Sequence, residues 1–465
     1  MLLFFIIVYL LLTVAVGIIA ARKVKNSSDY LLAGRKLPFY LATATIFATW
    51  FGSETLLGAS SQMSEKGLMG VIEDPFGASL CLILIGLFFA KPLYRMNLLT
   101  FGDFYRVKYN RQAEIIASIL LIISYYGWIA AQMVALGILF NVVAGIPGHY
   151  RILIGSLAVV IYTFLGGMWS VSITDFMQTI VIIAGLLFVT VEIMSKADFS
   201  AVIEQTPSEH FDFFPSERNF SSWLNYIAMW ITIGLGSIPQ QDVFQRVMSS
   251  KSEKVAVTSS IFAAFLYLSV ALMPLIIVMY TKVLYPEIYK GDTQLAIPNA
   301  VLFHSNLFVK VLFFGALISA IMSTASGAII APAAILSENI IKPYIKNISD
   351  KQFLRITRLS VILISVVSLL FAFLNSNIYE LVGTAAALSL VSLFVPLVAG
   401  LFWKKATPAA SIISMIAGFV CWLLAIHFET ELNPLLYGLA GSFCGMIAGM
   451  IVNIKGKTKE TTSPI

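Results

Sequence analysis

Hydrophobic and polar positions along this chain fall into long blocks. Runs of about 20 residues with almost no charge recur from one end to the other, and a helix of that length crosses ~30 Å of hydrocarbon. The pattern predicts thirteen membrane-spanning helices in an all-α polytopic membrane protein. The predicted spans are Leu2 to Ala21, Pro38 to Ser61, Pro75 to Leu93, Ile115 to Ala144, Ile152 to Leu165, Phe176 to Met194, Trp223 to Phe244, Val255 to Tyr280, Val311 to Leu336, Leu359 to Leu374, Leu381 to Trp403, Ala409 to Phe428 and Leu435 to Ile454.

The composition supports a membrane protein. The 465-residue chain is 59% hydrophobic and only 12% charged. An outer-membrane barrel does not fit, because its strands alternate polar and apolar residues in segments of about ten, whereas these runs are continuous. The first run is predicted to be a retained helix and not a signal peptide, because Arg22, Lys23 and Lys25 follow it instead of preceding it.

The distribution of charge predicts the orientation. If the N-terminus lies outside, 23 of the 30 lysine and arginine residues fall on the cytoplasmic side and six on the other. This asymmetry predicts a cytoplasmic C-terminus in a plasma or inner membrane. The basic residues lie between apolar runs, so the net charge of +6 predicts no nucleic-acid partner. Three cysteines within apolar runs and four scattered histidines indicate neither a disulfide framework nor a metal cluster.

The connections between the runs are short, and the longest one predicted outside covers residues 196–222. They leave no room for a soluble domain in this sequence. Function is therefore expected within the lipid bilayer, in a chain that acts as a monomer.

Two predicted spans are interrupted near their middle. The second carries Gly52 and the ionisable Glu54, and the seventh carries two glycines and Pro239 within residues 234–242. These spans are five apart, and a repeat of five helices must insert its second copy upside down. Breakers at corresponding positions of two such halves point to a transporter's midplane binding site, where unwound carbonyls are available to a cation. For either span alone, an ordinary glycine or proline kink is the alternative.

The ninth span carries a face of small and hydroxylated residues. Ala320, Ser323 and Thr324 are spaced i, i+3 and i+4, so they share one side of a helix. A carbonyl and two hydroxyls are neutral oxygen ligands that suit a hard monovalent cation. The same residue types also mediate helix packing and bond back to the previous turn, and spacing alone does not separate these interpretations.

Several stretches together resemble the sodium:solute symporters, a family that includes carriers of sugars, proline, sialic acid, pantothenate and choline. The most specific stretch is residues 162–178, a glycine pair followed by the pattern Thr-Asp-x-x-Gln. Supporting pieces are residues 32–35, 239–246 and 322–324. The resemblance covers essentially the whole chain. It implies a sodium-coupled symporter that works by alternating access, and not an enzyme.

The resemblance also implies a LeuT-type fold with an inverted 5+5 repeat. The expected organisation has a first helix and basic loop in residues 1–37 and five-helix halves in 38–222 and 223–403. Residues 404–465 then add two further helices and a short tail.

One sodium site is implied between the second and ninth spans. Its ligands would be the carbonyls of Ala48, Phe51 and Ala320 and the hydroxyls of Ser323 and Thr324. Some family members have a second sodium site, and Asp175 and Ser326 match two of its ligands. Gly327 stands where those members have another hydroxyl, which argues against a second sodium. Asp175 is then expected to anchor a turn over residues 174–178 at the membrane boundary.

The solute is the least determined feature. Residues 48–50 and 87–92 resemble the choline-carrier branch, in which tryptophans wrap a quaternary ammonium. The side chains predicted to line one solute site are Trp50, Glu54, Trp128 and Gln240, where Gln240 replaces a tryptophan of that branch. A cationic solute fits the indoles and the carboxylate. Alternatives are an amino acid, an organic acid or a sugar, with tryptophans that only pack and a glutamate that is protonated or paired with a backbone donor.

Two other functional classes share this fold. Some relatives are fused to signalling kinases, so a membrane sensor is one rival, although this sequence carries no such domain. A channel or uniporter is the other rival, and an intact set of five sodium ligands argues against it.

Overall fold

The computed structural model describes residues 2–146, 148–217 and 219–460, with residues 148, 149, 158, 162, 165, 166 and 452–460 described by their backbone alone. Arg218, counted above among the basic residues, lies outside this range. The described residues form helices, and the β pairing among them is a single bridge between Leu37 and Ser250. Ten described helices are long and apolar enough to cross a membrane, as a multi-pass membrane protein requires.

The helices follow one another with short connections. The longer ones are α1 (Leu2–Ala21), α3 (Phe39–Trp50), α8 (Arg111–Ala144), α9 (Gly148–Met194), α11 (Phe220–Gly236), α13 (Glu253–Leu284), α15 (Leu307–Ile335), α16 (Asp350–Leu374), α17 (Ile378–Ser389), α19 (Pro408–His427) and α20 (Pro434–Glu460). Shorter ones are α2 (Ser27–Leu32), α4 (Ala59–Lys66), α5 (Ala78–Leu84), α6 (Ala90–Met96), α7 (Phe101–Lys108), α10 (Phe199–Gln205), α12 (Gln241–Ser249), α14 (Ala296–His304) and α18 (Val395–Phe402).

Several predicted spans are built from more than one helix. The second span comprises α3, the single turn η2 (Glu54–Gly58) and α4, and the seventh comprises α11 and α12. Such pieces are individually shorter than a membrane crossing, so the count of thirteen stays a prediction. Several predicted boundaries were also too narrow: α16 begins at Asp350 and not at Leu359.

The region predicted as the fifth and sixth spans is covered by α9. Its two helical segments meet at a kink at Gly167, where φ is 59° and ψ is −176°. A Cβ atom at Gly167 would lie 2.5 Å from the ring of Tyr30, so both the conformation and the space require glycine. The predicted turn over residues 174–178 is wrong, because these residues continue the second half of α9.

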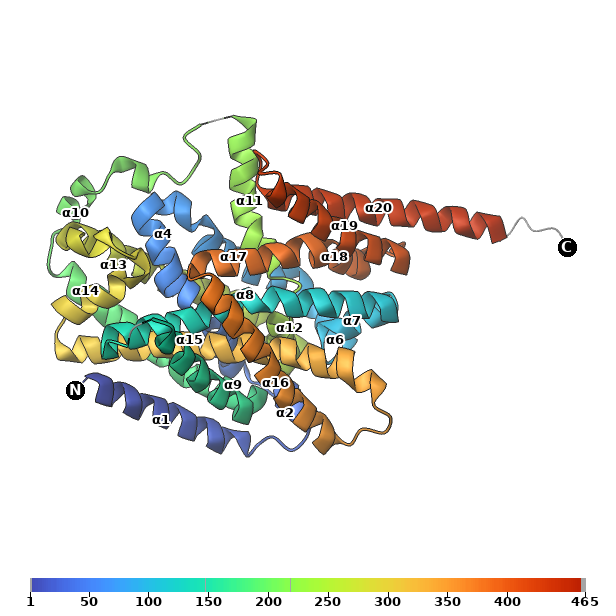
Figure 1. The fold of residues 1–465 in the computed structure, drawn as a ribbon, viewed down its shortest axis with the longest axis horizontal. Coiled ribbons are helices and arrows are strands. Elements are labelled where there is room, and N and C mark those ends of the chain that lie inside the picture. Colours follow the sequence, from blue (N-terminus) through green and yellow to red (C-terminus); the bar gives the residue numbers. More distant parts are fainter. Residues whose placement is uncertain (1, 147, 218, 461–465) are drawn as a thin grey trace.

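Helices α8 and α15 form the centre of the bundle. In α15 every residue from Phe313 to Ile335 is buried. Figure 1 shows α1 along one edge of the bundle and α19 with α20 along another, with α8 and α15 between them. Large apolar side chains such as Phe4, Phe262 and Leu363 are more than half exposed on the outside, as expected for a surface that faces lipid.

Both predicted helix breaks are present. Helix α3 ends at Trp50 and the next turn begins at Glu54, while α11 ends at Gly236 and α12 begins at Gln241. The prediction that these two spans are interrupted is therefore confirmed, while their offset of five spans stays a prediction. Residues from both breaks line one cavity inside the bundle.

Candidate functional site

The first break lies directly against α15. Phe51 leaves the helical region, with φ −85° and ψ 78°, so its carbonyl no longer follows the helix axis. A Cβ atom at Gly52 would lie 2.7 Å from the Thr324 hydroxyl oxygen and 2.4 Å from a carboxylate oxygen of Glu54. Glycine at position 52 therefore lets the broken segment approach both groups.

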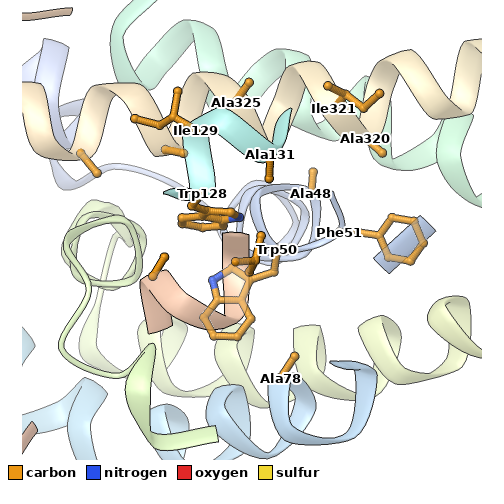
Figure 2. Close-up of a cluster of buried hydrophobic side chains, with 14 of the residues drawn as sticks. Ala48, Trp50, Phe51, Ala78, Trp128, Ile129, Ala131, Ala320, Ile321 and Ala325 are labelled. Carbon is orange, nitrogen blue, oxygen red and sulfur yellow. The ribbon is translucent and has the colours of Figure 1, made fainter. Parts of the chain in front are cut away.

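The oxygens predicted to bind sodium come from α3, its broken end and α15. The Thr324 hydroxyl donates a hydrogen bond to the Ala48 carbonyl oxygen at 3.2 Å. Figure 2 shows Ala48, Phe51 and Ala320 in the same cluster of buried residues. Ser323 is fully buried, and its hydroxyl donates to a carboxylate oxygen of Asp175 at 2.6 Å. The structure thus brings Ala48 and Thr324 into contact, while Ser323 bonds to an acidic side chain.

Asp175 lies deep in the bundle. Its side chain is fully buried and accepts hydrogen bonds from Ser323 of α15 and from Thr45 of α3. It therefore joins α3, α9 and α15 at one point. The Ser326 hydroxyl bonds back to the Ser323 carbonyl at 2.9 Å, so it points along its own helix and not at Asp175.

A buried arginine, absent from the sequence-based predictions, lies beside this cluster. Arg246 of α12 donates from Nε to the Thr49 hydroxyl at 3.1 Å and from Nη1 to the Asp242 carbonyl at 3.3 Å. A Cβ atom at Gly327 would lie 2.4 Å from Arg246 Nη2. The guanidinium therefore occupies the space beside Gly327, where a second-sodium site would need a hydroxyl.

A central cavity lies on the other side of the first break. The space that the centre of a water molecule can reach inside it is about 30 Å³, so in this conformation the cavity has room for water-sized groups. The lining residues are Trp50, Glu54, Asp74, Ala78, Trp128, Ile233, Ser237, Gln240, Tyr267, Val382, Ala385 and Ala386. All four side chains predicted to line a solute site are among them. Figure 2 shows Trp50 and Trp128 together in this region. Their role in binding stays a prediction.

Glu54 is held in place by two donors from α8. The Trp128 indole N–H donates to Glu54 Oε1 at 3.0 Å, and the Gln132 amide donates to Oε2 at 2.8 Å. The backbone N–H of Ser53 in turn donates to Gln132 Oε1 at 3.1 Å, which sets the orientation of the amide. The backbone N–H of Glu54 is a further donor to the carboxylate, so side-chain and backbone donors act on it together.

Asp74 is a second carboxylate in the cavity wall, and sequence reasoning missed it. It lies in the turn η4 (Ile72–Gly77), at a point where the backbone is extended with φ −143° and ψ 120°. Asp74 accepts hydrogen bonds from the Thr55 hydroxyl at 2.9 Å and from the Tyr267 hydroxyl at 2.5 Å. The available signal was an acidic pair, Glu73 and Asp74, directly before the apolar third span.

A wider cavity of about 730 Å³ lies on the other side of α17. Its walls include Lys66, Glu73, Thr232, Glu380 and Trp422. Helix α17 contributes Val382 to the central cavity and Gly383 to the wide cavity, so it forms the partition between them.

Comparison with known proteins assigns this arrangement to a family. Residues 30–418 match the model of the sodium:solute symporter family. The chain belongs to this family. Among curated relatives, the high affinity choline transporter 1 of Homo sapiens is 27% identical over 456 residues, which cover 93% of this chain and 78% of the relative. The sodium/proline symporter of Staphylococcus aureus strain JH9 is 25% identical, covering 96% of this chain and 90% of that one.

Solved structures agree with this symporter's fold. A sodium-coupled sialic acid symporter, substrate-bound and outward-open, superposes with a TM-score of 0.83 at 20% identity, covering 97% of this chain and 96% of that one. A nucleobase-cation-symport-1 family transporter superposes with a TM-score of 0.61 at 18% identity, covering 93% and 96%. The LeuT-type fold predicted from the sequence is confirmed. This symporter is a membrane transporter that couples a small organic solute to sodium, and not an enzyme.

Proposed function

We propose that this symporter imports a small organic cation, either a quaternary ammonium or an amine. The observation that carries the proposal is the meeting of Glu54, Trp50 and Trp128 in the wall of the central cavity. Indole faces and a desolvated carboxylate both attract an ammonium group. None of the twelve described residues that line the cavity is basic, which argues against an organic acid. The similarity to a choline transporter makes choline and betaine the first solutes to test.

Neutral solutes are the main alternative. The similarity to a sodium/proline symporter keeps an amino acid under consideration, because Glu54 can accept a hydrogen bond from an amine. An amino acid also carries a carboxylate that needs a donor, and Gln240 and Ser237 are the uncharged polar groups at the second break. A sugar would use the same uncharged polar groups for its hydroxyls.

We further propose one sodium ion between the first break and α15. Its ligands are the carbonyl oxygens of Ala48, Phe51 and Ala320 and the hydroxyl oxygens of Ser323 and Thr324. The donor set fits sodium, because the contact between Thr324 and Ala48 already brings two buried neutral oxygens together. A hydroxyl that donates one hydrogen bond keeps lone pairs for an ion, so the bond from Ser323 to Asp175 is compatible with a ligand role.

Sodium binding would couple the two sites through the broken helix. An ion shared by α3 and α15 orders the break, and the same break carries Trp50 and Glu54 into the solute cavity. Each ligand then raises the affinity for the other, as reciprocal linkage requires. At ~100 mV one inward sodium ion supplies about 2.3 kcal/mol, and a tenfold sodium gradient supplies about 1.4 kcal/mol more. Together this supports roughly 500-fold accumulation, so one ion suffices.

The proposed setting is the plasma or inner membrane, with the N-terminus outside, the C-terminus in the cytoplasm and the protein acting as a monomer. The asymmetry of basic residues supports this orientation. Within the chain, residues 38–222 and 223–403 are proposed as the two inverted halves, each of which contains one of the helix breaks.

Reconstituted protein tests the proposal directly. Purified symporter in liposomes should take up radiolabelled choline or another small amine only when an inward sodium gradient is imposed. A potassium gradient of equal size is the control. Competition by choline and betaine should be seen at millimolar concentration or below, whereas acetate and glucose should not compete. Absence of competition by any amine would contradict the cationic solute while leaving sodium symport in place.

A further inference from the structure

We propose that the solute carries two positive charges, as a short diamine does, with one ammonium group at Glu54 and the other at Asp74. This inference rests on the proposed import of a small organic cation and names its class more closely. It starts from the presence of two buried carboxylates in one small cavity.

The charges of the cavity are not balanced by the protein. Glu54 is 5% exposed and Asp74 is 1% exposed. Neither takes part in any ion pair recorded among the described residues, and no lysine, arginine or histidine is among those that line the cavity. Burying a carboxylate without a counter-charge is costly. A solute with two ammonium groups supplies both missing charges.

Two side-chain hydrogen-bond donors favour the ionised form of Glu54. Both of its oxygens accept from N–H groups, one from Trp128 and one from Gln132. An indole N–H cannot accept a hydrogen bond, and the amide is turned with its NH₂ group toward Glu54 by the bond from Ser53. Neither partner can accept a hydrogen bond from a neutral carboxyl group, so both stabilise the negative charge.

The surroundings of Asp74 allow its bonds to be exchanged for those of an ammonium group. Thr55 and Tyr267 donate to its two oxygens, and their own hydroxyl oxygens lie 2.6 Å apart. Either hydroxyl can therefore turn from the carboxylate to its neighbour. That rotation releases a carboxylate oxygen for an incoming N–H donor and leaves the hydroxyl with a partner.

The two carboxylates are close and share their cavity with apolar side chains. Thr55, the residue after Glu54, contacts Asp74 directly, so only a short solute can reach both. Ala78, Ile233 and Val382 supply apolar walls suited to a few methylene groups between the charges. A divalent metal ion is a poorer fit, because the described residues contain no group of three or more histidine, cysteine or acidic side chains placed to hold one.

The wide cavity on the other side of α17 is acidic as well. The extended backbone at Asp74 turns neighbouring side chains to opposite sides, so Asp74 faces the central cavity and Glu73 faces the wide cavity. Glu380 and Lys66 also line the wide cavity. Two acidic groups and one basic group therefore line the wide cavity, apart from the central cavity that holds Asp74.

The test compares amines of equal chain length that differ only in charge. The full chain in liposomes takes up a radiolabelled amine under an inward sodium gradient. The competitors are 1,4-diaminobutane, with two charges, and butylamine, with one. We expect the diamine to compete at least tenfold better. Asp74→Asn should reduce this preference to within about threefold, whereas Glu73→Gln, the matched loss of a carboxylate from the wide cavity, should keep it.

The outcomes separate this inference from the proposed function. Equal competition by both amines, with sodium-dependent uptake intact, would overturn the diamine and leave cation symport standing. Uptake of butylamine that rises in acid and becomes independent of pH in Asp74→Asn would also overturn it, because a proton on Asp74 would then replace the second ammonium group. Loss of all sodium-dependent amine uptake in the wild type would instead remove the proposed function. If Asp74→Asn does not fold, the comparison of the two amines on the wild type still decides.

Discussion

The proposed sodium site and the central cavity lie on two faces of one broken helix, and they differ in chemistry. Ala48 contacts α15 through Thr324, whereas Trp50 and Glu54 line the cavity. On the α15 side the proposed ligands are neutral carbonyls and hydroxyls. On the cavity side a carboxylate lies between an indole and an amide. Neutral oxygens suit a monovalent inorganic ion, and carboxylates with aromatic faces suit an organic cation.

This difference has a consequence for mutants. Because the two sites use separate residues of the same segment, the affinities for sodium and for solute can be changed one at a time. Transport needs both sites, since each proposed binding event orders the same break. Measurements of binding should therefore report the sodium affinity and the solute affinity separately, whereas measurements of uptake depend on both.

The largest effect is expected on the sodium side. Replacing Ser323 and Thr324 together by alanine removes two of the five proposed oxygen ligands and leaves a helix that still inserts. Sodium affinity should fall at least about tenfold, or about 1.4 kcal/mol, and sodium-dependent uptake should disappear. The measurement is sodium-induced thermal stabilisation of purified protein, together with uptake.

The matched control for the double variant lies in α16. Ser365 and Ser368 are buried there, and each hydroxyl donates to a carbonyl of its own helix. Replacing both by alanine should leave sodium affinity unchanged. Wild-type sodium affinity in the Ser323 and Thr324 double variant would refute the proposed ligand set.

On the cavity side, Glu54→Gln should weaken solute binding while sodium binding in the absence of solute stays unchanged. A hydrogen bond to a charged group contributes about 1.5–3 kcal/mol, so the solute affinity should fall roughly 10-fold to 100-fold for a cation. Titration calorimetry with choline or an amine measures the change. A loss of less than about threefold would indicate a neutral solute that only donates a hydrogen bond to Glu54.

A smaller loss is expected for the indole. Trp50→Ala removes one aromatic face from the cavity, and a desolvated contact between a cation and an aromatic ring is worth about 1 to 2 kcal/mol. Trp223→Ala is the control, because Trp223 is 39% exposed and does not line the cavity. If Trp50→Ala weakened a quaternary ammonium and its uncharged carbon analogue equally, Trp50 would only be packing.

The membrane-spanning helices and the broken segments could be predicted because their signals are local, whereas the LeuT-type fold was implied by the resemblance to the family. A glycine and a carboxylate within an apolar run indicate a break whatever surrounds them. Three of the four proposed solute residues, Trp50, Glu54 and Gln240, lie in or beside such breaks. The fourth, Trp128, was proposed because it matches an aromatic residue of the choline-carrier branch. The misses depend on partners far away in the chain. Asp74 lines the cavity only because Thr55 and Tyr267 hold it there.

The error at Asp175 has a related cause. The polar residues around it read as a loop at the end of a span, because a carboxylate in hydrocarbon is costly without partners. In the folded chain Thr45 and Ser323 supply those partners, and α9 continues as a helix through the region. Arg246 was likewise read as a loop residue, although it is 1% exposed and bonds to Thr49.

The smallest effect is expected for Asp175→Asn, which tests whether a second sodium ion binds. Asp175→Asn keeps an acceptor for one of its two hydroxyl donors, so transport should fall while the helices stay packed. The number of charges moved per solute should not change, because the Arg246 guanidinium already lies beside Gly327 and adds positive charge next to this cluster. Measuring the reversal potential of uptake in liposomes gives that number. A decrease by one charge in Asp175→Asn would show that a second sodium binds there, and the neutral-oxygen site would then be one of two.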